Sequence, residues 1–162
     1  MKKTLYGEKT QNQVIIIVFA FLIIGAIIGL FVSFASLAIL QNRAGSIDEI
    51  SPFWDSFRLN FTIDTIIICM NISLLSGLLF NYKKDYKNTK SPFLLGLVLF
   101  LLVLLVQSLL SLPILNLIVS IIEIGRQGAV NIFLTYKSSI FGILSHFFET
   151  VALIILFYLS RE

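Results

Sequence analysis

Four long apolar runs constrain this chain more than any other feature of its sequence. They cover, approximately, residues 14–40, 59–80, 93–113 and 139–160. Each has the roughly 20 residues that an α-helix needs to cross a hydrocarbon core of about 30 Å. In lipid, only helices and closed barrels satisfy their own backbone, and these unbroken runs lack the alternation of barrel strands. The sequence therefore predicts an all-α, polytopic membrane protein with four transmembrane helices.

The composition supports the same class of protein. Hydrophobic residues make up 57% of the 162 residues and charged residues only 13%, about half of the roughly 25% that is usual in soluble domains. We therefore expect residues 1–162 to form a single transmembrane domain. The first run is far longer than the core of a signal peptide, so we expect it to remain as a span. The single cysteine, Cys69, excludes a disulfide within the chain.

The distribution of basic residues predicts the orientation. Eight of the 12 Lys and Arg residues flank the runs on one side, at the two ends of the chain and in the loop "NYKKDYKNTK" after the second run. Cytoplasmic flanks carry the excess of Lys and Arg. We therefore expect a multi-pass protein of the cell membrane with both termini cytoplasmic. The eight residues are Lys2, Lys3, Lys9, Lys83, Lys84, Lys87, Lys90 and Arg161.

The segment between the third and fourth runs, about 114–135, is too polar for a fifth span because Glu123 and Arg126 lie near its centre. Its apolar residues recur at helical spacing. We interpret it as a short interfacial helix that follows a bend at Pro113, with a re-entrant segment left open as the alternative.

Polar residues inside the second run fall on one line. At 100° per residue, Asn60, Asp64 and Asn71 lie at about 0°, 40° and 20° around a helix. An acid at the centre of a membrane helix costs about 2.5–3.5 kcal/mol on insertion scales, so this side of the helix should face other helices.

The third and fourth runs carry matching polar groups, with Gln107 on the third and His146 and Glu149 on the fourth. Counting about 1.5 Å per residue from the predicted outer side places Asp64 at about 9 Å, His146 at about 12 Å and Glu149 at about 16 Å. We therefore expect an intramembrane polar cluster in the outer half of the bundle, with Asp64 and His146 as its first pair. The predicted cluster is Asn60, Asp64, Asn71, Gln107, His146 and Glu149.

Two interpretations of this cluster compete. It can fix helix packing through hydrogen bonds, or it can line a proton or ion path with His146 and Glu149 as the exchanging groups. The almost purely aliphatic inner half of the spans favours the first. One histidine is a weak ligand set, so we expect no metal site. No nucleophile, phosphate-loop or dinucleotide motif occurs in the sequence, so we expect no enzyme and no cofactor.

The first run contains small residues at four-residue spacing, Gly25, Gly29 and Ser33. This pattern lets a second helix approach closely. The second helix can belong to the same chain or to a partner.

Three stretches resemble the stage II sporulation protein M family of integral membrane proteins. "FGILSHFFETVALIIL" is similar to a family segment with Leu-Pro-His-Gly followed by Glu, with His146 and Glu149 as the matching residues. "FRLNFTIDTIII" matches at Asn60, and "PILNLIVSIIEIG" matches at Asn116 and Gly125. The sequence departs from the pattern at Ser145 and Phe147, and its His-to-Glu interval is one residue shorter. The resemblance implies a non-enzymatic component of a multiprotein membrane assembly.

The sequence therefore predicts a small integral membrane protein that acts as an accessory or scaffold subunit of a larger complex through helix–helix contacts. Its expected partners are membrane lipids and other membrane subunits, in a homo- or hetero-oligomer, and not nucleic acid. The alternative is a proton- or ion-conducting carrier or channel subunit that uses Asp64, His146 and Glu149.

Overall fold

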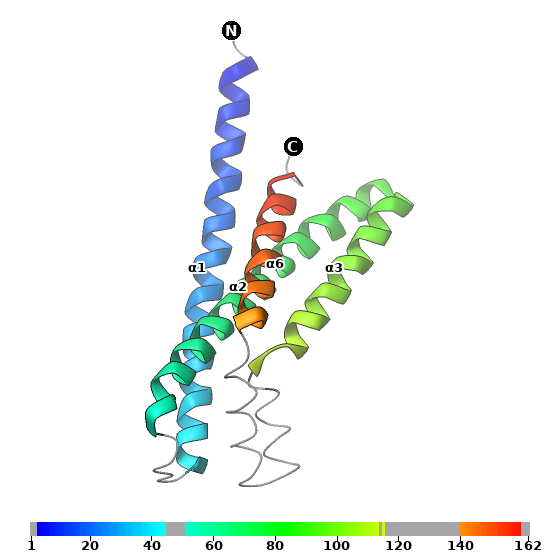
Figure 1. Ribbon diagram of the computed structural model, residues 1–162. Helices are drawn as coiled ribbons and strands as arrows, with labels where there is room; N and C mark the ends of the chain where they lie inside the picture. Colours follow the sequence, from blue (N-terminus) through cyan, green and yellow to red (C-terminus); the bar gives the residue numbers. More distant parts are fainter. Residues whose placement is uncertain (1–2, 45–50, 114, 116–139, 160–162) are drawn as a thin grey trace.

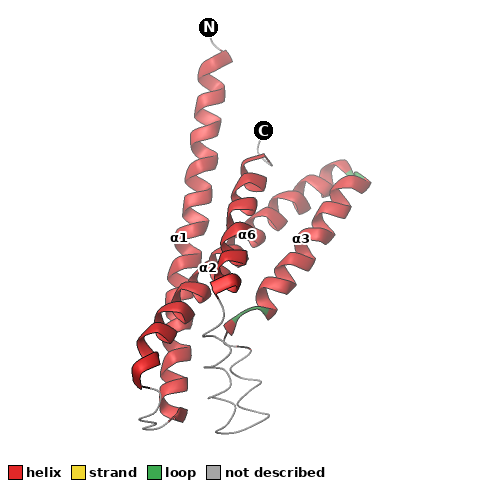
Figure 2. Cartoon of the chain, in the orientation of Figure 1, coloured by secondary structure: helices red, strands yellow, loops and turns green. Residues whose placement is uncertain are grey.

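The computed structural model describes residues 3–44, 51–113, 115 and 140–159. The regular structure of these residues is helical (Figure 2). Helix α1 covers Lys3–Ala44, α2 covers Ser51–Thr89, α3 covers Pro92–Leu110 and α6 covers Ile140–Leu159. The prediction of an all-α chain is therefore confirmed for the described residues.

Three of these helices are long and apolar enough to cross a membrane. Their candidate spans are Ile15–Ile39, Asp55–Thr89 and Pro92–Leu110. The apolar part of α6, Gly142–Tyr158, is shorter. These lengths and compositions indicate a membrane-associated protein. The predicted interfacial segment 114–135 lies outside the described residues, apart from Leu115.

Helices α1 and α2 extend well beyond the apolar runs that predicted them. At about 1.5 Å per residue, the 42 residues of α1 and the 39 of α2 are about 63 and 58 Å long, about twice the thickness of a hydrocarbon core. The stretch that we expected to be a loop, "NYKKDYKNTK", is helical up to Thr89. Its Lys, Tyr and Asp residues have no strong preference against a helix, so the helix continues until Pro92 imposes a break.

A two-residue turn joins α2 to α3. Lys90 has φ 51° and its amide donates to the Tyr86 carbonyl at 2.8 Å, which closes the last turn of α2. Ser91 is extended, and Pro92 opens α3 at a position where the missing N–H costs nothing. Helix α3 then ends at Leu110, three residues before Pro113 and not at it as predicted. The Ser111 amide donates to the Gln107 carbonyl at this end.

Helix α2 is the central helix and contacts each of the other three. The beginning of α1, the end of α6 and the α2–α3 turn lie at the same end of the bundle (Figure 1). Helices α1 and α2 run antiparallel, so their contacts follow one another in opposite order along the two helices. These contacts pair Phe21 with Ser73, Gly25 with Met70, Gly29 with Ile66 and Ser33 with Thr62.

The buried core lies between α2, α3 and α6, toward the end where α1 begins and α6 finishes. Its fully buried side chains are large and aliphatic or aromatic, and Val18 of α1 closes one side. The outward faces of α1 and α3 remain apolar, as Phe31 (78% exposed) and Phe93 (77%) illustrate. Because lipid tails are as apolar as these side chains, such faces suit a bilayer. The core is formed by Val18, Leu74, Leu75, Leu78, Tyr82, Leu101, Leu153 and Phe157.

Candidate functional site

Asn71 of α2 joins α2 to α6 through its side chain, which is completely buried. Its amide nitrogen donates to the carbonyl of His146 at 3.1 Å, and its amide oxygen accepts from the Thr150 hydroxyl at 2.6 Å. The same hydroxyl lies 2.9 Å from the His146 carbonyl. A hydroxyl has one proton, so Thr150 shares it between the two acceptors or alternates between them.

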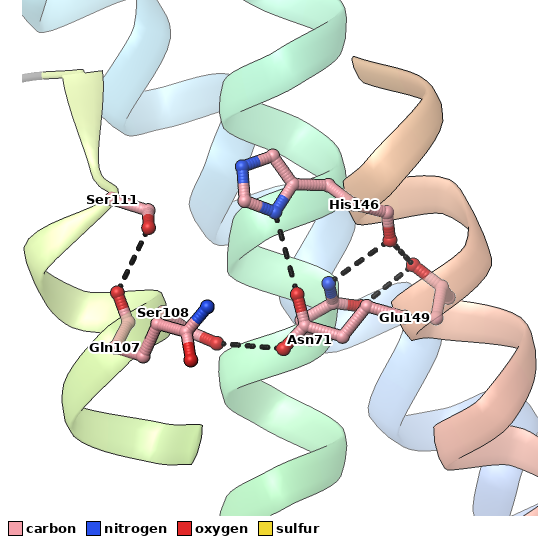
Figure 3. Close-up of polar contacts among 7 residues, drawn as sticks. Asn71, Gln107, Ser108, Ser111, His146 and Glu149 are labelled. Carbon is pink, nitrogen blue, oxygen red and sulfur yellow. Dashed lines mark hydrogen bonds and ion pairs between the residues drawn. The ribbon is translucent and has the colours of Figure 1, made fainter. Parts of the chain in front are cut away.

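The side chains of His146 and Glu149 face this joint from α6 (Figure 3). They lie one helical turn apart, with 3.3 Å between His146 Nδ1 and Glu149 Oε2. The other carboxylate oxygen of Glu149 accepts from the Ser108 hydroxyl of α3 at 3.1 Å. Both side chains are about one-fifth exposed. Glu149 therefore connects α6 to α3, while Asn71 connects α6 to α2.

Asp64 lies on the same side of α2 as Asn71, two turns earlier. Seven residues separate them, which is about 10 Å along the helix. The Asp64 side chain is 5% exposed and interacts electrostatically with the His146 ring. Side chains on a helix tilt toward its N-terminus, so the ring of His146 reaches toward the level of Asp64 while its carbonyl faces Asn71. The structure thus brings together Asp64, Asn71, His146 and Glu149 of the predicted cluster.

Gln107 does not join this cluster. Its side chain is exposed, and its backbone carbonyl accepts from the hydroxyl and amide of Ser111 on its own helix. Ser108 occupies the position that we expected Gln107 to take, because the side of α3 that faces α2 runs through Leu101 and Ser108, seven residues apart. Asn60 is half-buried, near the start of the same line on α2.

Sequence reasoning did not place Ser108 and Thr150 in the cluster. Thr150 follows His146 by four residues, so helical spacing was a usable signal for it. For Ser108 no comparable signal exists, because α3 is Leu-rich on all sides and its sequence alone does not reveal which side faces α2.

The α2 residues of the cluster lie near the level of the middle of the α1 span, whereas Ser108 lies two residues before the end of the α3 span, so the predicted position in the outer half stays a prediction. The centre of the Ile15–Ile39 span of α1 is Ile27, which the antiparallel contacts place opposite Ile68 of α2. Asn71 is then about 5 Å and Asp64 about 6 Å from this level, on opposite sides of it.

An apolar plug separates the cluster from one end of the bundle. Leu74, Leu75 and Leu78 follow Asn71 on α2, and they are completely buried. Leu101 of α3 and Phe157 of α6 are also completely buried at this level. These side chains offer water and ions no hydrogen-bonding or coordinating group. The polar groups therefore do not continue through the core toward Tyr82.

The predicted packing residues Gly25, Gly29 and Ser33 lie against α2. A Cβ atom at Gly25 would come within 2.6 Å of the Met70 Cα, and one at Gly29 within 2.7 Å of the Ile66 Cα. Both neighbours are backbone atoms, which cannot move aside without shifting the helix. The Ser33 hydroxyl donates to the Thr62 hydroxyl at 2.9 Å.

Among the described residues, no group of three His, Cys, Asp or Glu side chains could hold a metal ion. Cys69 is buried at the contact between α1 and α2. What the arrangement can do is hold three helices together through hydrogen bonds, and hold a proton at the His146–Glu149 pair.

Long helices with apolar outward faces, joined inside by a few polar side chains, define a helical membrane protein. The chain belongs to the family described as "Family of unknown function (DUF8036)", whose model matches residues 60–161. The match includes the whole cluster around Asn71 and leaves out α1. No curated protein and no solved structure matches the chain.

Proposed function

We propose that this protein is a non-enzymatic accessory or scaffold subunit of a larger membrane complex, which it joins through helix–helix contacts. The observation that supports this function best is the hydrogen bonding of the cluster. Asn71, Ser108, Glu149 and Thr150 bond to one another or to a helix carbonyl across three helices. Polar groups used in this way stabilise a helix bundle and leave its outer faces for other contacts.

The proposal includes four spans in the cell membrane, with both termini cytoplasmic. Helix α6 has 20 residues, which corresponds to about 30 Å and suffices for a fourth crossing. The start of α1, the end of α6 and the Lys-rich end of α2 lie at one end of the bundle (Figure 1). A cytoplasmic location of this end agrees with the excess of basic residues there.

The interpretation of 114–135 as an interfacial segment and the resemblance to the stage II sporulation protein M family stay predictions. The resemblance and the proposal agree on a role within an assembly. His146 and Glu149, which carry the resemblance, are in contact in the structure. Asn116 and Gly125 lie outside the described residues.

The alternative function is proton or ion transport through Asp64, His146 and Glu149. The contact of His146 with Glu149 and its electrostatic interaction with Asp64, all within apolar helices, favour it. The apolar plug of Leu74, Leu78 and Phe157 opposes it, since a path needs polar groups or water along its whole length.

One set of variants separates the two functions. In the accessory role, Glu149→Gln removes the charge that accepts from Ser108 of α3, and His146→Ala removes the ring that interacts with Asp64 of α2. They should therefore reduce both the yield of folded protein and the recovery of a discrete complex of fixed mass, larger than the 18.2 kDa chain, from native membranes. Val151→Ala on the exposed side of α6 is the matched control and should leave both unchanged.

The same proteins, purified and placed in liposomes, test the alternative. Wild-type protein should give no pH-dependent ion flux above that of empty liposomes. A flux that wild-type protein supports and that Glu149→Gln abolishes, without loss of folded protein, would refute the accessory role in favour of transport.

A further inference from the structure

Gly96 on α3 differs from Gly25 and Gly29 of α1 and Gly77 of α2. The Cβ positions of Gly25, Gly29 and Gly77 lie within about 3 Å of atoms of a neighbouring helix, whereas nothing lies within 4 Å of the Cβ position of Gly96. A glycine within a helix costs about 0.5–1 kcal/mol relative to alanine. The three other glycines permit close packing inside the chain, and Gly96 has no such neighbour.

Gly96 begins a line of exposed residues along α3. At 100° per residue, its members lie within about 40° of one direction, at alternating intervals of four and three residues. This spacing is that of helices packing side by side in a left-handed pair. All five are exposed, with Val103 at 62% and Leu110 at 65%. We refer to these residues as the α3 stripe: Gly96, Phe100, Val103, Gln107 and Leu110.

Gln107 makes the stripe unsuited to lipid alone. Its neighbour Ser108 bonds to Glu149, which places Gln107 at the level of Glu149 and within the apolar span of α3, three residues before its end. The Gln107 side chain has no hydrogen-bond partner among the described residues. An amide without a partner in hydrocarbon is costly, and membrane helices satisfy such groups across helix–helix contacts.

A second copy of the chain provides a partner amide at the right depth. Two copies inserted in the same orientation place every residue at the same depth, so two α3 helices packed in parallel bring Gln107 next to Gln107 of the other copy. An amide both donates and accepts, so it pairs with its own kind. In a contact with two-fold symmetry, each subunit uses the same patch, so every residue on the axis meets its own copy. A different partner would need a polar group of its own at that depth.

We propose that the α3 stripe is the contact between two copies of this chain, with the two Gln107 amides hydrogen-bonded to each other toward the C-terminal end of the α3 span. The inference makes the proposed accessory role more specific and rests on it. The small Gly96 allows close approach toward one end of the contact, and the amides fix the register between the two helices.

Cysteine cross-linking in lipid bilayers tests the contact. In a Cys69→Ala background, Val103→Cys places a thiol on the stripe and Leu102→Cys places one at nearly the same depth, about 100° away. Both positions are exposed. Oxidation should give several-fold more disulfide-linked dimer for Val103→Cys. Equal yields for the two variants would refute the proposal.

Gln107→Leu tests the amide pair in the otherwise natural chain. Interhelical hydrogen bonds in membranes contribute enough that their loss should weaken dimerisation about 3- to 30-fold, measured by energy transfer as the protein is diluted with lipid. Gln107→Asn retains an amide and should recover part of the affinity. Unchanged dimerisation in Gln107→Leu would overturn the proposed role of the amides.

The failure of this inference can be told apart from the failure of the accessory role. If the purified chain is monomeric but a discrete complex with another polypeptide is obtained from native membranes, the contact between copies is wrong and the accessory role stands. If the chain dimerises through the stripe and native membranes yield only that dimer, the contact stands and the accessory role is wrong.

Discussion

Helix α2 uses opposite chemistry on its two sides. Toward α1, it accepts Gly25 and Gly29 so closely that the backbones nearly touch, and the hydroxyl groups of Ser33 and Thr62 bond to each other. Toward α6, it offers the Asn71 amide, and Glu149 continues the network to Ser108 of α3.

The difference shows two ways to hold helices together without a hydrophobic driving force between them. Close contact gains van der Waals attraction over a long line of atoms, and it fails abruptly when a single atom is added. A hydrogen-bonded joint gains less in total, but it fixes which residues lie opposite each other. The α1 contact should therefore be the more sensitive to added volume, and the α6 contact the more sensitive to lost polarity.

Gly25→Ala should have the largest effect on stability. Its new Cβ atom would meet the Met70 Cα at 2.6 Å and the Cys69 carbonyl oxygen at 2.8 Å, and neither can move without displacing α2. We expect a loss of about 1–3 kcal/mol, the usual range for added volume in a packed interior. Unfolding of the purified protein by titration with a denaturing detergent measures it.

Gly96→Ala is the matched control, because nothing lies near its Cβ position. For the monomer, it should leave stability unchanged or raise it by about 0.5–1 kcal/mol. Equal destabilisation by the two alanine variants would contradict the close packing of α1 on α2.

Asn71→Leu should have the second largest effect. It removes the donor to the His146 carbonyl and the acceptor for the Thr150 hydroxyl while keeping a side chain of similar size. We expect a loss of about 1–2 kcal/mol from the same unfolding titration. Ser76→Ala, whose exposed hydroxyl bonds only to its own helix, should change stability little. If Asn71→Leu lowered the free energy of unfolding more than Gly25→Ala does, the α6 contact and not the α1 contact would be the more sensitive of the two.

Ser33→Ala should have the smallest effect. It removes one hydrogen bond, to the Thr62 hydroxyl, from a contact that rests mainly on close packing. The average for hydrogen bonds between membrane helices is about 0.6 kcal/mol, and we expect a loss near this value. A double-mutant cycle with Thr62→Val isolates the pair. A coupling as strong as that between Asn71 and Thr150 would remove the distinction between the two sides of α2.

The helical character of the chain and much of the cluster followed from the sequence, because polar residues are conspicuous against apolar helices. Asn71 and Asp64 fall on one line of the second run, and His146 and Glu149 on one line of the fourth. Their gathering then follows from the cost of polar groups in lipid. Which partner each group finds depends on helix rotation and neighbour order, so the bonds of Asn71 to the His146 carbonyl and the Thr150 hydroxyl were not predicted.

Gln107 and Ser108 illustrate a contact that the sequence alone does not predict. Adjacent residues on a helix point about 100° apart, so only one of the two can face α2. In a helix that is rich in leucine on all sides, the larger amide was the natural choice, but the structure turns the smaller hydroxyl inward. Helix ends were also difficult to predict, since apolar runs mark the hydrocarbon and not the helix, which in α2 continues to Thr89.

The buried position of Cys69 turns the chain's sole thiol into an internal reporter. Its carbonyl and its Cβ face the two glycines of α1, so α1 itself shields it. An alkylating reagent that partitions into the bilayer should reach the sulfur only when α1 has moved away. The rate of thiol labelling would therefore record how often the first helix detaches from the rest, in living cells and without any change to the sequence.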